Sequence, residues 1–188
     1  IPTRGVGGNG RWQRTAIEKQ GIDLVVWTNT EGVSATDLAR QQKDAGYTVW
    51  QDYDGPDGMR AYMDEVVAAN PDLLKQEVIG QTYGTDPEGD GPDVPRDIVA
   101  LKLTVDANTV ADNSRPAVLY SATQHAREWI STEVSQRLLE WLIKMYREDR
   151  QEIVDLLGST ELWFVMVANP DGYQYTFDHE RLWRKNLR

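Results

Sequence analysis

The chain has 188 residues and a formal net charge of −10, with 30 Asp and Glu against 20 Lys and Arg residues. This length fits one ordinary domain, or one domain with a tail. The acidic balance argues against a nucleic-acid-binding module, which needs a basic face. Because the chain has no cysteine, disulfide scaffolds, thiol nucleophiles and Cys-ligated zinc are excluded. It has only two histidines, so a metal site with three histidines cannot be built from this chain alone.

No hydrophobic run approaches the ~18 residues that a membrane span requires. The longest run, Leu162 to Ala168, suits a buried strand. The start of the chain has no signal-peptide pattern. An acidic chain without cysteine is compatible with secretion from a bacterium. This composition does not establish secretion. We expect neither a membrane nor a nucleic-acid partner.

The first part of the chain contains few structural signals before a pronounced turn. Residues 1–14 are rich in Gly and Arg without periodicity, which indicates a flexible lead-in. Ile22 to Thr28 is a short apolar run with β-branched residues and predicts a strand. A short helix is predicted over residues 34–45, after capping residues. The turn residues of segment 52–58 (DYDGPDG) mark the best internal boundary.

A helix and two strands are predicted after this boundary. The helix should span residues 59–69 and end at Asn70, because the following proline disfavours helix in the residue before it. Segments 74–82 and 98–105 alternate apolar and polar residues, as a half-exposed pair of strands would. The acidic segment 84–95 between them is predicted to be an enlarged hairpin loop.

Two features of this sequence have competing interpretations. The acidic residues of segment 86–97 imitate the spacing of a calcium loop, but their flanks are predicted strands rather than helices, and we favour a solvated hairpin. The seven tryptophans suggest a sugar-stacking surface. They are scattered, however, and Trp141 and Trp163 fit buried faces better.

The second half of the chain alternates strands and helices. Residues 117–122 and 162–167 are apolar runs that predict buried strands. Between them, apolar residues follow a helical period over residues 131–146, and a second helical stretch, 148–157, stops at Gly158. Segment 169–172 (NPDG) is a strong turn signal. The strand–helix–strand order permits a parallel crossover, so we predict an α/β fold with a mixed sheet flanked by helices.

The candidate site follows the first of these buried strands. In open α/β sheets, ligands bind at the carboxyl ends of strands. His125 and Glu128 are three residues apart and can face the same side of a turn, where an imidazole nitrogen and a carboxylate oxygen suit zinc. The alternative is a helix N-terminus at which Glu128 complements the helix dipole and His125 makes a local hydrogen bond.

Three motifs together resemble the zinc carboxypeptidases of the carboxypeptidase A and B type. The motifs are residues 125–131 (HAREWIS), 169–173 (NPDGY) and 181–185 (RLWRK), in the order and at separations comparable to that family. Residues 97–103 (DIVALKL) also resemble the strand that precedes the family's metal loop. The resemblance covers roughly residues 51–188.

The resemblance implies a role for each matching residue. His125 and Glu128 match two of the family's three zinc ligands. Arg127 matches an arginine that contacts substrate upstream of the scissile bond. Arg184 matches the arginine that binds and polarises the scissile carbonyl and stabilises the oxyanion, a role suited to a permanently charged guanidinium. The cofactor implied is one Zn²⁺ ion.

Other groups that the resemblance implies have no match in this chain. In the family, the third zinc ligand, the carboxylate-binding Asn–Arg pair, the closing tyrosine and the general-base glutamate all come later, beyond the position of Arg188. His179 does not match a ligand position, and we expect it to be exposed in a polar loop. Residues 51–188 are therefore interpreted as the N-terminal half of a catalytic domain. Residues 1–50 are interpreted as a connector, or the end of a propeptide or accessory segment.

The expected parent protein is a secreted zinc metallocarboxypeptidase that removes C-terminal residues from peptides or proteins through a zinc-activated water. The 188-residue chain alone is expected to be inactive. One alternative is a non-catalytic binding relative, and another is a carboxypeptidase of cell-wall peptides. The preferred C-terminal residue and the oligomeric state remain open.

Overall fold

The computed structural model describes residues 5–7, 10–19, 22–28, 51–84 and 94–187. The chain divides into two units, residues 1–49 and 50–188. The helix predicted over residues 34–45 and most of the acidic hairpin loop lie outside the described residues.

The first unit contains a three-stranded antiparallel sheet of β1 (Gly5–Gly7), β2 (Gly10–Lys19) and β3 (Ile22–Thr28). The strand predicted at β3 is confirmed. The flexible lead-in predicted over residues 1–14 is wrong, because β2 pairs with β3 from Gln13 opposite Thr28 to Lys19 opposite Ile22. Backbone pairing with the apolar strand makes β2 a strand, although its own sequence does not alternate.

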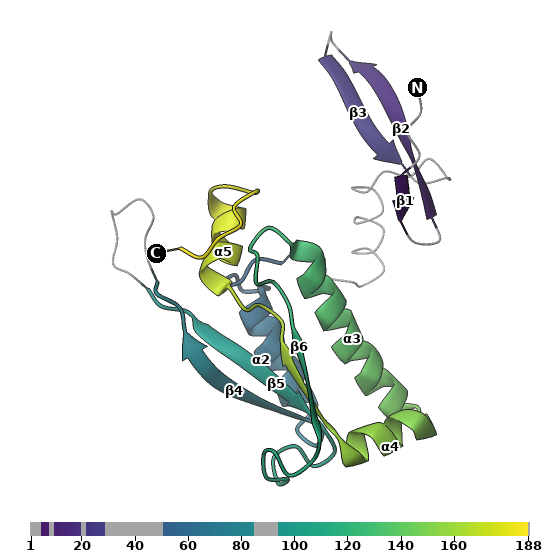
Figure 1. Cartoon of the computed structure of the whole chain (residues 1–188), viewed down its shortest axis with the longest axis vertical. Helices are drawn as coiled ribbons and strands as arrows, with labels where there is room; N and C mark the ends of the chain where they lie inside the picture. The colour runs from purple at the N-terminus through teal and green to yellow at the C-terminus, as the bar shows by residue number, and fades with distance from the viewer. Residues whose placement is uncertain (1–4, 8–9, 20–21, 29–50, 85–93, 188) are drawn as a thin grey trace. The chain divides into compact units, whose positions relative to one another are not determined.

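The second unit is a mixed sheet with flanking helices, as predicted (Figure 1). The strand order is β4-β5-β7-β6. Strands β4 and β5 pair antiparallel, β5 and β7 pair antiparallel, and β6 and β7 pair parallel. Its strands are β4 (Leu74–Gln81), β5 (Asp97–Leu103), β6 (Ala117–Ser121) and β7 (Glu161–Val165). Its helices are α2 (Met59–Ala69), α3 (Trp129–Arg147), α4 (Gln151–Ser159) and α5 (Pro170–Asp178).

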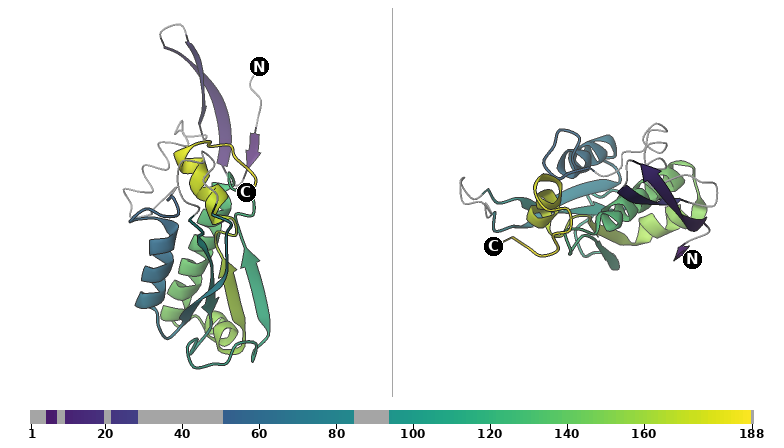
Figure 2. Two further views of the ribbon diagram at one scale, coloured as in Figure 1. Left: turned by 90° about the vertical axis from the view of Figure 1, so that its left-hand side faces the viewer. Right: turned by 90° about the horizontal axis from the view of Figure 1, so that it is seen from above.

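The sheet and the helices share one hydrophobic core. Figure 2 shows α2 and α3 on the same side of the sheet. Met63 of α2 and Leu139 of α3 are buried in one cluster with Leu101 of β5 and Phe164 of β7. Burial of such side chains contributes about 1.5–3 kcal/mol each, so this cluster fixes the position of both helices on the sheet.

The three helices predicted within residues 51–187 are present, although α4 begins at Gln151 rather than at residue 148. Helix α2 has the predicted bounds, and α3 extends the predicted helix at both ends. Helix α4 continues through Gly158 to Ser159, so the predicted stop at Gly158 is wrong. A Cβ atom on Gly158 would meet nothing within 4 Å, so the helix tolerates this residue without needing glycine.

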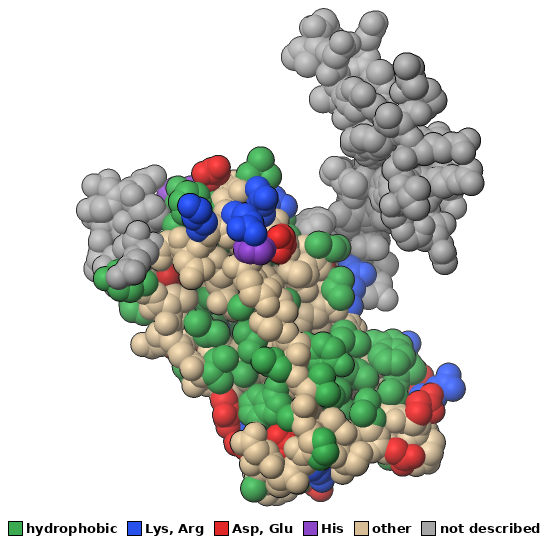
Figure 3. All heavy atoms as spheres, viewed as in Figure 1, with side chains coloured by type: hydrophobic (Ala, Val, Ile, Leu, Met, Phe, Trp, Pro, Cys, Tyr) green, Lys and Arg blue, Asp and Glu red, His purple; other side chains and the backbone are tan. Residues whose placement is uncertain are grey.

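Two predictions about burial are wrong. All five residues of β6 are exposed, because β6 is an edge of the described sheet. Trp141 is 50% exposed on α3. Figure 3 shows hydrophobic side chains gathered over α3 and the strands beside it. The exposed large apolar residues of these two elements are Val118, Leu119 and Tyr120 of β6 and Ile130, Val134 and Trp141 of α3.

Strand β5 is also more buried than its alternating sequence predicts. Its last five residues are all buried, including Lys102, which is 0% exposed. Lys102 donates to the carbonyl oxygen of Val110 at 3.1 Å and forms an ion pair with Asp112. Lys102 can be buried because its charge is paired with Asp112. A polar residue at this position therefore does not mean that β5 faces water.

Within the part of the chain that the structure describes, no helix combines the length and the hydrophobicity needed to cross a membrane.

Candidate metal centre

His125 and Glu128 lie in the loop between β6 and α3, at the carboxyl end of a parallel strand. Nδ1 of His125 is 3.0 Å from Oε1 of Glu128. Their side chains are 40% and 47% exposed, so solvent reaches both. The two side chains therefore converge on one point at the surface.

This separation fits a shared zinc ion. Two tetrahedral zinc ligands, each about 2.1 Å from the ion, lie about 3.4 Å apart. The 3.0 Å between Nδ1 of His125 and Oε1 of Glu128 is the length of a direct hydrogen bond, which is also what the helix-start alternative predicts. A shared ion requires the two atoms to separate by about 0.4 Å. Among the residues that the structure describes, no group of three or more His, Cys, Asp or Glu side chains is placed to hold a metal. A zinc ion held by this pair would need a third protein ligand.

The backbone of the loop is held in place by Thr123. This residue is fully buried and has a φ of 54°, in the left-handed region that β-branched residues rarely adopt. Its hydroxyl lies 3.0 Å from Oγ of Ser131 and 2.5 Å from Oγ1 of Thr132, in the first turn of α3. Ser131 in turn donates to the carbonyl oxygen of Glu128 at 2.7 Å. These bonds fix where the loop turns from β6 into α3.

The segment that carries Arg184 lies against the same loop. The backbone nitrogen of Ala126 donates to the carbonyl oxygen of Arg184 at 3.1 Å. The side chain of Arg184 is exposed. A backbone hydrogen bond therefore holds Arg184 next to Ala126, the residue that follows His125.

A second contact joins the loop to this segment through Arg181. Its guanidinium donates to the carbonyl oxygen of Arg127 at 3.1 Å and lies 3.5 Å from the ring centroid of Trp129. The Trp129 ring also stacks on Phe177 of α5, with centroids 4.1 Å apart, and its Nε1 donates to Oγ1 of Thr176 at 2.7 Å. A cation–π contact and an aromatic stack of this kind fix the orientation of the ring.

Comparison with known proteins decides the family. A model of the family described as zinc carboxypeptidase matches residues 59–188, which is more than half of the chain. The chain belongs to the zinc carboxypeptidase family. The resemblance seen in the three sequence motifs is thereby confirmed.

Curated relatives carry carboxypeptidase names. Carboxypeptidase B from Canis lupus familiaris is 30% identical over 161 residues, which are 86% of this chain and 35% of the relative. Metallocarboxypeptidase A from Trichophyton tonsurans is 39% identical over 74 residues, covering 39% of this chain and 17% of the relative. The chain thus spans about a third or less of the relatives that it matches.

Solved structures of carboxypeptidases share the fold. Thrombin-activatable fibrinolysis inhibitor has a TM-score of 0.60 at 22% identity, covering 87% of this chain and 39% of that one. Carboxypeptidase A from Helicoverpa armigera has a TM-score of 0.54 at 22% identity, with the same coverage. The mixed sheet with its flanking helices is therefore a zinc-carboxypeptidase fold, of which this chain covers a part.

The NPDGY motif begins a helix, and the sequence prediction of a simple turn is wrong. Asn169 caps α5 by accepting a hydrogen bond from the backbone nitrogen of Gly172 at 3.1 Å. Pro170 occupies the first helical turn, where its missing N–H costs nothing, and Asp171 adds a negative charge near the positive end of the helix dipole. Asn and Pro are common in turns, but they are also common at the start of a helix. The sequence prediction missed this second possibility for Asn169 and Pro170.

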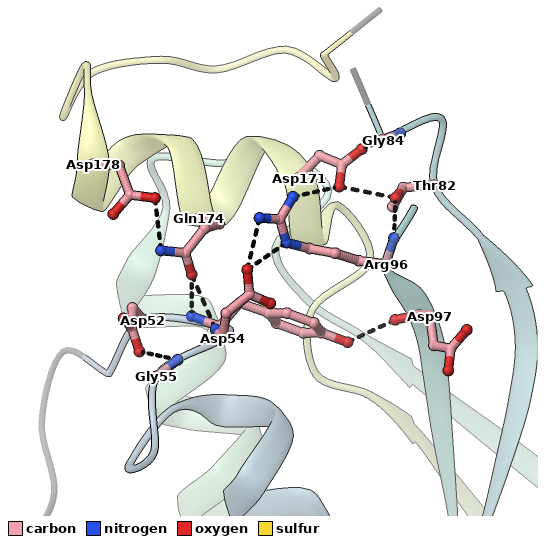
Figure 4. Close-up of polar contacts among 11 residues, drawn as sticks. Asp52, Asp54, Gly55, Thr82, Gly84, Arg96, Asp97, Asp171, Gln174 and Asp178 are labelled. Carbon is pink, nitrogen blue, oxygen red and sulfur yellow. Dashed lines mark hydrogen bonds and ion pairs between the residues drawn. The ribbon is translucent and has the colours of Figure 1, made fainter. Parts of the chain in front are cut away.

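Asp171 joins this helix to the base of the β4–β5 hairpin (Figure 4). Its carboxylate accepts hydrogen bonds from Oγ1 of Thr82 at 2.8 Å and from the backbone nitrogen of Gly84 at 2.9 Å, and it pairs with Arg96 at 2.9 Å. Arg96 also contacts Asp54 at 2.6 Å. The network ties three distant parts of the chain together.

Tyr53 extends this group of contacts to the start of β5. Its hydroxyl donates to the carbonyl oxygen of Asp97 at 2.6 Å. Burial raises the pKa of Tyr53 to about 12, so the phenol stays protonated and remains a donor at neutral pH. Gln174 of α5 accepts hydrogen bonds from the backbone nitrogens of Tyr53 and Asp54, at 2.9 and 3.0 Å.

The structure places the remaining predicted site residues as follows. Arg127 lies in the His125–Glu128 loop, and its side chain is exposed. His179 is exposed at the C-terminal end of α5, where its ring stacks on Tyr175 with centroids 4.7 Å apart.

Proposed function

We propose that this chain forms part of the active site of a zinc metallocarboxypeptidase, which removes C-terminal residues from peptides or proteins. The observation that carries the proposal is the 3.0 Å separation of His125 Nδ1 and Glu128 Oε1. Membership of the zinc carboxypeptidase family supports the choice of metal and of reaction class.

The residues of this chain have distinct roles in the proposed site. His125 and Glu128 hold the ion, and the carboxylate partly neutralises it. The chemistry that bound zinc supplies in such sites is activation of a water molecule and polarisation of a carbonyl group. Arg184 stabilises the negative charge that develops on the scissile carbonyl oxygen. Arg127 contacts the peptide upstream of the scissile bond.

The proposed site is completed by polypeptide outside this chain. A catalytic zinc site needs three protein ligands and a position for water, and the described residues supply two ligands. We propose that the third ligand, the general base and the groups that bind the substrate carboxylate follow residue 188 in the parent protein. We also propose that the parent is secreted, since its substrates are peptides and the chain is acidic and free of cysteine.

Peptide hydrolysis by the full-length parent protein tests this function. We expect release of the C-terminal residue from peptides with a free carboxylate, no release from the same peptides with an amidated C-terminus, and loss of activity with a chelator that zinc reverses. Arg184→Ala should lower kcat by about 100-fold or more. Arg150→Ala, at an exposed position between α3 and α4, is the matched control and should change kcat little.

Three outcomes would overturn the proposal. Full activity of the purified 188-residue chain would show that no further residues are needed. A parent protein that binds peptides without cleaving them would be the non-catalytic relative. Cleavage confined to cell-wall peptides would assign the site to a different substrate class.

A further inference from the structure

We propose that Asn169 and Gly172 are positioning residues for Arg184. Together they form the binding site of the Lys185 carbonyl group, which we call the seat. Because Lys185 is the neighbour of Arg184, the seat fixes the backbone position from which the Arg184 side chain extends. The inference rests on the role of Arg184 in the proposed function. It assigns to the NPDGY motif a part in the reaction beyond starting α5.

Asn169 makes two hydrogen bonds in opposite directions. Its Oδ1 accepts from the backbone nitrogen of Gly172 at 3.1 Å, which caps α5. Its Nδ2 donates to the carbonyl oxygen of Lys185 at 3.1 Å. Asn169 is 4% exposed, so water does not replace either partner cheaply. One side chain therefore orders the helix start and the Arg184 segment together.

Gly172 allows the close approach that this second bond requires. A Cβ atom at this position would lie 2.6 Å from the carbonyl oxygen of Lys185 and 2.6 Å from Nδ2 of Asn169. Side-chain atoms do not occupy such distances, so any larger residue would displace the Lys185 carbonyl or the asparagine. The carbonyl of Lys185 also accepts from Nε1 of Trp183 at 2.7 Å, which holds the segment from its other side.

Two consecutive carbonyl groups of the segment are thus held by different parts of the site. Lys185 is bound to Asn169, and Arg184 is bound to the backbone nitrogen of Ala126 beside His125. The residue before Asn169 is tied to the residue after β6, because the backbone nitrogen of Ala168 donates to the carbonyl oxygen of Ala122 at 3.0 Å. The Cα atom of Arg184 is therefore placed relative to the His125–Glu128 pair by a closed ring of hydrogen bonds, one of which comes from the side chain of Asn169.

A purely structural role for Asn169 predicts different results from a positioning role. Asn169→Asp keeps an acceptor for the Gly172 nitrogen, and aspartate caps helices as well as asparagine does. It replaces the donor to Lys185 with a carboxylate oxygen, which repels the carbonyl. Gly172→Ala favours helix, yet its Cβ would crowd the Lys185 carbonyl and also Oδ1 of Asn169, at 2.6 and 2.8 Å. Both variants thus disturb the seat, and Asn169→Asp is the one that preserves the helix start.

The test is made on the full-length parent protein with two readouts. The first is hydrogen exchange at the Ala126 amide, whose acceptor is Arg184. We expect exchange to rise by about tenfold in Asn169→Asp and in Gly172→Ala. The second is peptide hydrolysis, in which kcat should fall by about 10-fold or more while KM changes less than about twofold, because Arg184 acts in the transition state.

Asn108→Asp is the matched control. Asn108 also donates its side-chain amide to backbone carbonyls, those of Pro71 at 2.7 Å and Leu74 at 3.1 Å, away from the site. This variant should leave kcat and Ala126 exchange unchanged. In an Arg184→Ala background, Asn169→Asp should have little further effect on kcat, since the group that it positions is gone.

The results separate this proposal from the function on which it rests. Unchanged Ala126 exchange in both seat variants would overturn the positioning role whatever the activity. A kcat loss that adds fully to that of Arg184→Ala would also overturn it. If the parent protein hydrolyses no peptide, the proposed function fails, and Ala126 exchange still decides whether Asn169 and Gly172 place the Arg184 segment.

Discussion

The carboxylate of Asp171 and the guanidinium of Arg96 form an ion pair of 2.9 Å, in which the side chain of Asp171 is only 3% exposed. The pair connects the first turn of α5 with the base of the β4–β5 hairpin. Because α5 packs against Trp129 at the start of α3, this pair supports the loop that carries His125 and Glu128.

Removing Arg96 should therefore destabilise the protein strongly. Arg96→Ala leaves the buried Asp171 carboxylate without its cation, and we expect a loss of about 3 kcal/mol in the free energy of unfolding. Asp54 is the second partner of Arg96 and is 48% exposed, so Asp54→Asn should cost at most about 1 kcal/mol. Urea denaturation of both variants makes the comparison, and equal losses would contradict the assigned role of Asp171.

Acid should weaken the contact between β5 and the loop at Asp112. Hydrogen bonds from Lys102 and then from Lys75 lower the pKa of Asp112 from its ordinary value of 3.8 to about 2. A carboxyl group whose pKa is lowered by folding stabilises the folded state above its unfolded pKa. This stabilisation should be complete above about pH 4 and lost as the pH falls towards about 2.

Lys102→Met should reduce that acid sensitivity. The substitution removes the larger cause of the lowered pKa and leaves Lys75 paired with Asp112 at 2.9 Å. Thermal unfolding followed by circular dichroism at several pH values should show a smaller change in stability between about pH 4 and pH 2 than in the unaltered protein. Lys144→Met, at a lysine that is 68% exposed, should leave the pH dependence unchanged. If stability changed with pH as steeply in Lys102→Met as in the unaltered protein, Lys102 would not be the main cause of the lowered pKa of Asp112.

Thr123 should show a balance between backbone strain and side-chain hydrogen bonds. Thr123→Gly relieves the φ of 54°, worth about 1–2 kcal/mol, but loses the hydroxyl contacts to Ser131 and Thr132. Thr123→Val loses the same contacts and keeps the strain. We expect the Gly variant to be more stable than the Val variant by about 1–2 kcal/mol in chemical denaturation. The reverse order would show that the left-handed backbone is not strained.

The exposed edge strand should limit the solubility of the 188-residue chain. Leu119 is 65% exposed on β6, and an apolar edge strand offers free backbone groups to another chain. Leu119→Lys should raise the concentration at which the chain stays monomeric, measured by light scattering, with little change in stability. Leu101→Lys, at a fully buried position on β5, should unfold the protein. Unchanged association in Leu119→Lys would exclude β6 as the cause.

Helical periodicity explains why part of the fold could be predicted from the sequence. The apolar repeat of α3 predicted that helix, although Ile130, Val134 and Trp141 of the repeat are exposed and Leu142 enters the core. Helix α2 has its predicted end at Asn70, before Pro71. The prediction for α5 failed because Asn169 and Pro170 are typical of turns as well as of helix starts. Burial of β6 was predicted from its apolar residues, but burial depends on what lies beside a strand, which its own sequence does not contain.

The site was predictable where the spacing in sequence was short. His125 and Glu128 are three residues apart, and the structure brings their donor atoms to 3.0 Å. The contacts of Asp171 with Thr82, Gly84 and Arg96 join segments 75 or more residues apart, and no local pattern indicates them. Resemblance to a family identified the NPDGY motif, but only the folded chain shows what its residues touch.

The most direct test of the proposed metal centre is the position of zinc in crystals of the full-length parent protein, located by anomalous scattering at the zinc absorption edge. The account predicts one strong peak at about 2.0–2.2 Å from Nδ1 of His125 and from a carboxylate oxygen of Glu128. Zinc bound elsewhere, with His125 and Glu128 still hydrogen-bonded to each other, would contradict it.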